Sequence, residues 1–209
     1  MVNKLISWIL GYCFGCVQSA YIFGRIFKGI DIREHGSGNA GTTNAIRVLG
    51  TKIGVSVFIV DALKGVIAFL ISYFIFKDNV VALYAGFGAV IGHTFPAQLG
   101  FKGGKGVATS LGVLCIFDWQ LGRIIVVMAI LIIGLSRYVS LGSVVCALTL
   151  ATLAFFKYSF GEIFFVYFVL VALLVYKHKA NIVRLVKGEE RKLSFKSKGS
   201  KDKVDKEDE

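Results

Sequence analysis

Residues 53–76 read IGVSVFIVDALKGVIAFLISYFIF, an apolar run interrupted by one acidic and one basic residue. A helix needs about 20 such residues to cross the hydrocarbon core of a bilayer, so this run is long enough to span a membrane. The whole chain has 209 residues, of which 56% are hydrophobic, and its mean hydropathy is +0.71. A soluble domain of this length could not bury so much apolar surface. The sequence therefore predicts an all-α integral membrane protein.

Six further apolar runs flank this one, so we expect about seven transmembrane helices joined by short loops. The run at 107–117 is too short to cross the membrane as a straight helix. It either extends back into the glycine-rich residues before it or is a re-entrant segment, which is allowed only where protein or water covers the polar backbone. The predicted spans cover residues 5–24, 53–76, 80–95, 107–117, 124–135, 138–156 and 163–176.

Basic residues are concentrated in alternate loops of this arrangement. They follow the first, third, fifth and seventh spans, whereas the loops at 77–79, 118–123 and 157–162 carry fewer of them. Because short cytoplasmic loops of membrane proteins are enriched in lysine and arginine, we place the N-terminus outside and the C-terminus inside. The glycine-rich polar loops then lie on the cytoplasmic face. The same bias accounts for the net charge of +11, so we expect no nucleic-acid partner.

The end of the chain differs in composition from the rest. Residues 187–209 mix lysines with acids and contain few apolar side chains after Phe195, so we expect a disordered tail after one membrane-embedded domain at 1–186. The four cysteines lie in apolar segments, where free thiols pack as small hydrophobes. The C-x-x-C at 13–16 has no second ligand pair, and we expect neither a metal nor a cofactor.

Two polar, glycine-rich segments interrupt the hydrophobic pattern. Residues 36–47 read GSGNAGTTNAIR, and residues 92–106 read GHTFPAQLGFKGGKG. Glycine lets backbone N–H groups approach a ligand closely, hydroxyls and amides add neutral donors, and arginine and lysine supply positive charge. Simple glycine-rich turns would not explain these cations, so we predict a cradle for a phosphate-bearing anion at the membrane surface. Its candidate binding residues are Ser37, Gly38, Asn39, Gly41, Thr42, Thr43, Asn44, Arg47, Lys102, Gly103, Gly104, Lys105 and Gly106.

Three ionisable residues lie within or at the end of predicted spans. Asp61 and Lys64 are three residues apart in the second span, at a depth where charged groups usually have a function. We expect a support role in which Asp61 holds a cationic ligand residue in place, although the pair could simply neutralise itself. His93 lies beside the lysines of the second polar segment and is a candidate for substrate contact or for a structural hydrogen bond. Position 98 is Gln, which argues against the acyltransferase type that pairs a histidine with an aspartate five residues later.

Two further segments on the same predicted face carry polar side chains at helical spacing. Ser140 and Ser143 could each point a hydroxyl into the site, and ordinary packing of small residues is equally consistent with their spacing. Residues 178–190 read HKANIVRLVKGEE, which places His178, Asn181 and Arg184 near one another on a helix. A generic basic helix at a membrane surface would need neither the asparagine nor the Gly-Glu ending.

These blocks resemble the bacterial acyl-phosphate-dependent glycerol-3-phosphate acyltransferases, the PlsY family. The resemblance extends to about residue 190 and leaves out only the charged tail. It implies that Ser37, Arg47, Lys105, Ser143, His178 and Asn181 surround glycerol 3-phosphate and the acyl-phosphate head, while the backbone of 38–44 cups a phosphate. The blocks that carry it are SGNAGTTN at 37–44 with Arg47, GHTFP through GGKG at 92–106, and HKANI at 178–182 with Arg184.

The resemblance further implies transfer of a fatty acyl group from acyl phosphate to the 1-hydroxyl of glycerol 3-phosphate. The products are lysophosphatidic acid and phosphate, and the reaction opens phospholipid synthesis in the bacterial inner membrane. The implied partners are the two substrates, membrane lipid and an enzyme that produces acyl phosphate.

An acyl phosphate is a mixed anhydride with a good leaving group, so no acyl-enzyme is required. We expect direct attack by the 1-hydroxyl, with a substrate phosphate oxygen taking the proton and the protein supplying orientation and positive charge. The alternative is that His93 or His178 acts as the general base.

Two other classes of function remain open from the sequence. A transporter for an organic phosphate would share the basic face and the broken helices, but the chain has no detectable repeat relating two halves. A non-catalytic lipid-binding scaffold would leave the dense cationic and hydroxyl residues without a purpose. The sequence therefore favours the enzyme.

Overall fold

The computed structural model describes residues 1–193, so the tail predicted to be disordered lies outside the described residues from position 194 onward. Within the described part the chain is all-helical, which confirms the predicted class. The helices are α1 (Val2–Gly15), α2 (Ser19–Lys28), α3 (Thr42–Leu49), α4 (Thr51–Phe76), α5 (Asn79–Thr94), α6 (Val107–Phe117), α7 (Trp119–Ser136), α8 (Val139–Tyr158), α9 (Glu162–Lys177) and α10 (Lys179–Val186), with short 3-10 turns η1 (Ile32–Glu34) and η2 (Ala97–Leu99).

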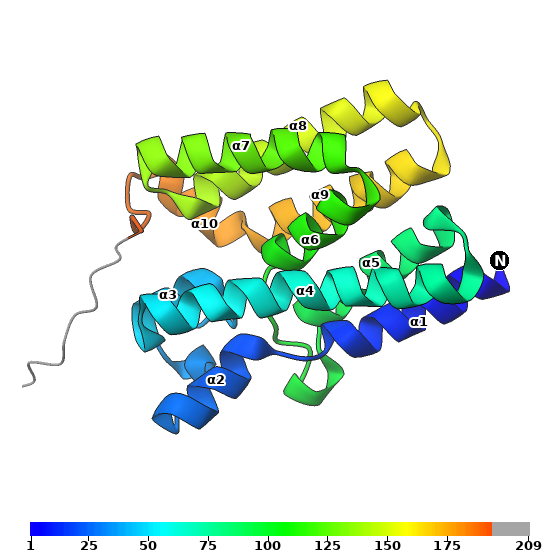
Figure 1. Cartoon of the computed structure of the whole chain (residues 1–209). Helices are drawn as coiled ribbons and strands as arrows, with labels where there is room; N and C mark the ends of the chain where they lie inside the picture. The colour runs from blue at the N-terminus through cyan, green and yellow to red at the C-terminus, as the bar shows by residue number, and fades with distance from the viewer. Residues whose placement is uncertain (194–209) are drawn as a thin grey trace, which may run out of the picture.

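The long helices form two groups that meet at the short helix α6 (Figure 1). In one group α5 packs against α1 and α4, and in the other α8 packs against α7 and α9. Helix α6 touches α4 and α5 on one side and α7 on the other. Helices α3 and α10 lie at the end of the bundle opposite the N-terminus (Figure 1).

The closest helix contact, between α1 and α5, depends on glycines from both helices. A Cβ atom built on Gly11 would lie 1.8 Å from the carbonyl oxygen of Ala85, and one built on Gly88 would lie 2.1 Å from that of Trp8. Gly15 and Gly92 repeat the arrangement one turn further along, against backbone of the facing helix. Small residues four positions apart let membrane helices approach until their backbones touch, which is the packing observed here.

Aspartates begin two of the helices at the end of the bundle near the N-terminus. The Asp78 carboxylate accepts hydrogen bonds of 2.7 and 3.1 Å from the backbone N–H groups of Val80 and Val81 at the start of α5. Asp118 accepts one of 3.2 Å from the N–H of Leu121 in α7. Both satisfy donors that the first turn of a helix leaves unpaired.

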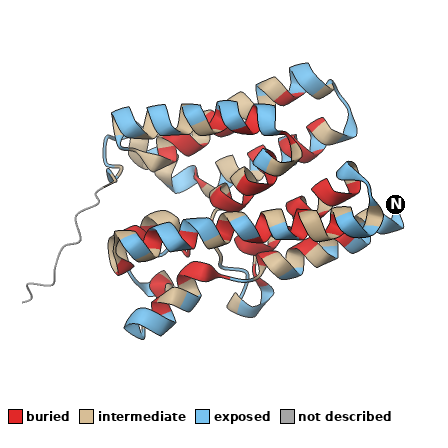
Figure 2. Ribbon diagram, viewed as in Figure 1, coloured by how far each residue is buried: buried red, intermediate tan, exposed pale blue. Residues whose placement is uncertain are grey.

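The outer faces of the long helices are apolar and exposed, as expected for lipid contact. Ile59 of α4, Leu131 of α7 and Phe168 of α9 are 49, 57 and 52% exposed, respectively. Figure 2 shows exposed residues along the outward faces of α4, α7 and α8, with the buried residues between the layers.

The exact count of seven spans is not confirmed. Five segments of residues 1–193 are long and apolar enough to cross a membrane, and a sixth is obtained if α9 and α10, which meet at 58°, form one broken span. Helix α6 has only 11 residues. The first predicted span is divided into α1 and α2 near Gln18, whose side-chain amide donates to the carbonyl oxygens of Gly15 and His93.

Candidate active site

A cavity of about 1660 Å³ lies between the two helix groups. Its polar mouth is formed by the first glycine-rich segment, Lys105, α10 and the residues after α10. Its interior is apolar and is lined by Leu114 of α6, Ile125 and Ala129 of α7, Ala147 and Leu150 of α8 and Leu170 of α9. The cavity therefore joins a charged entrance to a hydrophobic chamber.

The Asn44 side chain holds the first glycine-rich loop in shape. It is 1% exposed; its amide donates to the carbonyl oxygens of Ile32 and His35 at 3.1 and 3.0 Å, and its oxygen accepts from the Ser37 N–H at 2.8 Å. The backbone of Gly36 has φ +66°, and a Cβ there would lie 2.3 Å from the Asn44 oxygen. The buried Asn44 side chain therefore fixes the backbone conformation of the first glycine-rich loop.

This loop leads directly into α3 at the cavity mouth. No side chain caps the start of the helix at Gly41, and Thr42 and Thr43 in its first turn line the cavity. Free backbone N–H groups and the positive end of the helix dipole favour a bound anion at such a position. Arg47, on the next turn of the same helix, also lines the cavity.

Lys105 is the lysine of the second glycine-rich segment that reaches the cavity. Its ammonium donates a hydrogen bond to the side-chain oxygen of Asn181 on α10. Burial lowers the pKa of Lys105 to about 8, an effect that the Glu190 carboxylate opposes and that Arg184 and Arg47 reinforce. Lys102 is exposed and does not line the cavity.

His93 belongs to a buried cluster that joins α2, α4 and α5. Lys64 Nζ lies 2.8 Å from Asp61 Oδ1, 2.8 Å from His93 Nδ1 and 2.6 Å from the carbonyl oxygen of Val17, and the Ser19 hydroxyl donates to Asp61 at 2.8 Å. A protonated lysine only donates, so His93 Nδ1 accepts and Nε2 carries the proton.

The Nε2 side of the His93 ring packs against the second glycine-rich segment. A Cβ built on Gly104 would lie 2.1 Å from Nε2, and the Gly104 N–H donates to the His93 carbonyl oxygen at 3.1 Å. Gly103 is equally tight, since a Cβ there would lie 2.1 Å from that oxygen. These two glycines therefore contact His93, and the buried cluster supports the loop that carries Lys105.

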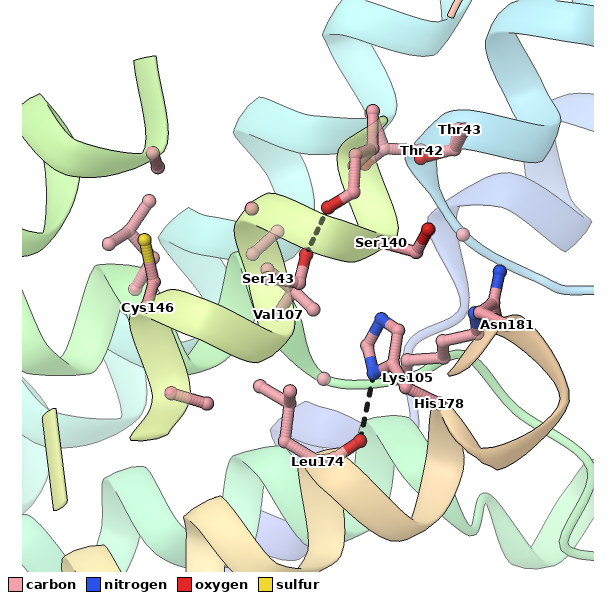
Figure 3. Close-up of a pocket in the computed structure, with 18 of the residues that line it drawn as sticks. Thr42, Thr43, Lys105, Val107, Ser140, Ser143, Cys146, Leu174, His178 and Asn181 are labelled. Atoms are coloured by element: carbon pink, nitrogen blue, oxygen red, sulfur yellow. Dashed lines mark hydrogen bonds between the residues drawn. The ribbon is translucent and has the colours of Figure 1, made fainter. Parts of the chain in front are cut away.

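His178 lies where α9 ends and α10 begins. Its Nδ1 is 2.8 Å from the carbonyl oxygen of Leu174, which can only accept, so Nδ1 carries the proton and Nε2 is left as an acceptor. Figure 3 shows His178, Lys105, Asn181 and Ser140 together at one end of the pocket. His178 is 3% exposed and lines the cavity.

The two serines of α8 have different partners. Ser143 donates to the Val139 carbonyl oxygen of its own helix at 2.9 Å, and Ser140 donates to the Glu190 carboxylate at the same distance. Both line the cavity.

Most of the residues singled out from the sequence line one cavity. Asp61 and His93 also line this cavity. Lys64 does not line it, but its ammonium contacts both of these residues. The members that line it are Ser37, Gly38, Asn39, Gly41, Thr42, Thr43, Asn44, Arg47, Lys105, Gly106, Ser143, His178 and Asn181; Lys102, Gly103 and Gly104 do not.

Three residues that were not predicted as part of the site also line the cavity: Glu190, Arg191 and Lys177. The Gly-Glu ending after residue 187 was the available signal for Glu190. The sequence gives no indication that this ending folds back against α8.

Comparison with known proteins agrees with this geometry. A family model described as glycerol-3-phosphate acyltransferase matches residues 5–188. The chain belongs to this family. A relative of that name from Thermoanaerobacter sp. (strain X514) is 42% identical over 193 residues, covering 92% of this chain and 97% of the relative. Another from Clostridioides difficile (strain 630) is 41% identical over 202 residues, covering 93% and 97%.

Two solved structures share the fold. The glycerol 3-phosphate form of PlsY (YgiH), an integral membrane glycerol 3-phosphate acyltransferase, has a TM-score of 0.83 at 37% identity, covering 91% of this chain and 96% of that one. The lysophosphatidic acid form of PlsY has a TM-score of 0.80 at 36% identity, covering 92% and 96%. The resemblance inferred from the sequence motifs is thereby confirmed. This family member is an integral membrane acyltransferase, which decides against the transporter and the scaffold.

Proposed function

We propose that this acyltransferase moves a fatty acyl group from acyl phosphate to the 1-hydroxyl of glycerol 3-phosphate without forming an acyl-enzyme. The products are lysophosphatidic acid and phosphate. The observation that carries the proposal is the cavity that joins a cationic mouth to an apolar chamber. One substrate has a hydrophobic chain and a phosphate, and the other has a phosphate and the attacking hydroxyl.

Two phosphate groups close together need several positive charges at the mouth. Arg47, Lys105, Arg184 and Arg191 line it, and the first turn of α3 adds the positive end of a helix dipole. These groups hold the phosphates and stabilise charge that develops on the leaving phosphate as the acyl carbon is attacked. The acyl chain extends between α6, α7 and α8.

Direct transfer is supported by the partners of the nucleophilic side chains. The Ser143 hydroxyl donates to a backbone carbonyl of its own helix, and the Ser140 hydroxyl donates to a carboxylate. The Cys146 thiol lies in the apolar chamber and faces the Ile125 carbonyl oxygen at 3.7 Å. Nucleophilic catalysis needs a neighbouring base, and the backbone carbonyl oxygens beside Ser143 and Cys146 are not bases. The Glu190 carboxylate beside Ser140 also accepts from Asn181 and Arg184, and these hydrogen bonds hold its pKa below the usual value, which makes it a weak base.

The attacking hydroxyl must lose a proton, and we propose that a substrate phosphate oxygen accepts it. Of the two candidate histidines, His178 has an acceptor nitrogen available at the cavity, whereas the Nδ1 of His93 is engaged by Lys64. His178→Ala distinguishes the two acceptors. A general base is worth about 10²–10⁴ in kcat, so a fall of less than about tenfold fits the substrate oxygen. A larger fall in kcat with an unchanged KM for glycerol 3-phosphate would assign the proton to His178.

The orientation of the protein follows from its basic loops. We propose that it lies in the bacterial inner membrane with the N-terminus outside and the cavity mouth facing the cytoplasm. Acyl phosphate would then reach the mouth from an enzyme that produces it in or at the cytoplasm.

The decisive experiment is acyl transfer by the purified protein in lipid. Labelled glycerol 3-phosphate is offered with palmitoyl phosphate, palmitoyl-CoA or palmitoyl acyl carrier protein, and labelled lysophosphatidic acid is measured. Product from palmitoyl phosphate alone is expected. Product from a thioester alone would overturn the proposed donor.

A further inference from the structure

Glu190 is a carboxylate placed among cations at the cavity mouth. Its Oε1 accepts hydrogen bonds from the Ser140 hydroxyl at 2.9 Å and the Asn181 amide at 2.7 Å, and its Oε2 accepts from Arg184 Nε at 2.7 Å. The Glu190 side chain is 6% exposed. Burial alone would raise the pKa of Glu190, but these hydrogen bonds hold it below its usual value. Glu190 is therefore a fixed negative charge in a site built for anions.

The Asn181 amide lies between Glu190 and Lys105, and its orientation is determined by both. A lysine ammonium only donates and a carboxylate only accepts. The amide nitrogen must therefore face Glu190 and the amide oxygen must face Lys105, which is the observed arrangement. A continuous chain of hydrogen bonds runs from Arg184 through Glu190 and Asn181 to the Lys105 ammonium.

The backbone after α10 brings Glu190 into this position. Gly188 has φ +71°, a left-handed conformation that reverses the chain, and the Glu189 N–H donates to the Arg184 carbonyl oxygen at 2.8 Å. Further along, the Leu193 N–H donates to the carbonyl oxygen of Arg137 at 2.7 Å. The segment that holds Glu190 is thus tied to α10 on one side and to the turn between α7 and α8 on the other.

We propose that Glu190 is a positioning residue for acyl transfer: it fixes the Asn181 amide and, through it, holds the Lys105 ammonium toward the substrate phosphate. This inference rests on the proposed function, because Lys105 is assigned there to phosphate binding. A carboxylate that merely competed with substrate for the cations would instead weaken phosphate binding, and its removal would improve activity.

Glu190 also influences the charge of Lys105. The pKa of Lys105 is about 8 because of burial, and Glu190 raises it, whereas Arg184, Arg47 and Lys177 lower it. His178 faces Lys105 as well. Removing the Glu190 charge therefore lowers the pKa of Lys105 further, so less of the lysine is protonated at a given alkaline pH.

The first test compares Glu190→Gln with Glu189→Gln. The neighbouring Glu189 is exposed and does not line the cavity, so its variant is the matched control. We expect E190Q to lower kcat/KM about tenfold to a hundredfold, which is the effect of losing one hydrogen bond to a charged group. We also expect the fall of kcat/KM at alkaline pH, the alkaline limb of the pH profile, to begin at a lower pH than in the wild type. E189Q should change neither. An E190Q variant with wild-type kcat/KM and an unmoved limb, or with higher activity, would overturn the proposal.

A charge-conserving swap provides the second test. In the double variant Asn181→Asp with Glu190→Gln, the new carboxylate at position 181 accepts from Lys105 and the new amide at position 190 donates to it, so the hydrogen-bond chain is restored. The single variant N181D places two carboxylates side by side. We expect the double variant to recover at least about tenfold over either single variant. Additive losses would contradict a hydrogen-bond chain.

Labelling of Lys105 separates this inference from the proposed function. An amine-reactive reagent labels the neutral form of lysine, and mass spectrometry of the peptide carrying Lys105 gives the midpoint of its titration without any substrate. The midpoint is expected at lower pH in E190Q than in E189Q, and an unchanged midpoint counts against the coupling. If wild-type protein transferred no acyl group while the midpoint still shifted, the proposed function would fail and the Glu190–Lys105 contact would stand. Thermal unfolding of each variant checks that it is folded.

Discussion

At the scale of single residues, the charge state of Lys105 should set the alkaline limit of the reaction. Lysine is cationic below its pKa, and burial brings that of Lys105 to about 8. The protonated form that holds a phosphate is therefore lost as the pH rises through about 8, and kcat/KM should fall over that interval. The fall is measured between pH 6 and 10 with glycerol 3-phosphate varied.

Lys105→Arg tests this assignment, because arginine stays charged throughout that range. We expect lower activity, since the planar fork cannot reproduce the contact to Asn181, but without the alkaline limb. A limb that persisted in K105R at the same pH would assign the titration to another group. Arg123→Ala, at an exposed position that does not line the cavity, is the control.

Asp61 should matter more for stability than for substrate contact. Its side chain is 2% exposed and lies 2.8 Å from the Lys64 ammonium. Asp61→Asn leaves that lysine buried beside a neutral amide, and breaking a buried ion pair costs about 3–5 kcal/mol in the free energy of unfolding. We expect a lower thermal midpoint in detergent than for the exposed control Glu34→Gln, and equal midpoints would contradict a supporting role.

At the scale of helices, the α1–α5 contact should be intolerant of any side chain at its glycines. Gly88→Ala drives a methyl group to 2.1 Å from the Trp8 carbonyl oxygen, so the two helices must separate. Gly134→Ala on α7 is the matched control, because a Cβ there meets nothing within 4 Å. We expect a lower thermal midpoint for G88A and an unchanged or higher one for G134A. A midpoint for G88A equal to that of wild type would show that the helices can shift without cost.

The bounds of a helix could be predicted where they depend on local composition. They could not be predicted where they depend on a contact with a residue far away in the sequence. The run at 53–76 is apolar throughout and forms α4 at Thr51–Phe76. The first predicted span consists of two helices, α1 and α2, and the side-chain amide of Gln18 between them binds the carbonyl oxygen of His93, 75 positions away. A sequence read in local windows contains no trace of such a bond.

At the scale of the whole molecule, the polar blocks were predicted to share one face and most of them line one cavity. Short segments rich in glycine, hydroxyl, amide and basic residues are typical of anion-binding sites, so their composition alone predicts such a site. Glu190 has the opposite charge to its neighbours, and its position depends on the turn at Gly188 and on contacts with α8. Lys102, in contrast, belongs to a segment with the composition of the cradle but is exposed and does not line the cavity.

The apolar chamber should set which acyl chains are transferred. Ala129 of α7 lines it, whereas Leu131 on the same helix is 57% exposed and does not. Ala129→Phe fills the chamber, so a long chain no longer fits while a short one does. We expect the ratio of kcat/KM for palmitoyl over lauroyl phosphate to fall about tenfold, within the range that pocket-size discrimination supplies.

Leu131→Phe adds a ring of the same size to the lipid-facing side of α7 and should leave that ratio unchanged. If both variants kept the wild-type ratio, the acyl chain would have to lie outside the chamber, along the surface of the bundle. A drop in activity of A129F with both donors alike would instead indicate damage to the mouth. Only a loss confined to the longer donor locates the chain between α6, α7 and α8, because a steric limit inside the chamber acts on chain length and not on the phosphate that both donors share.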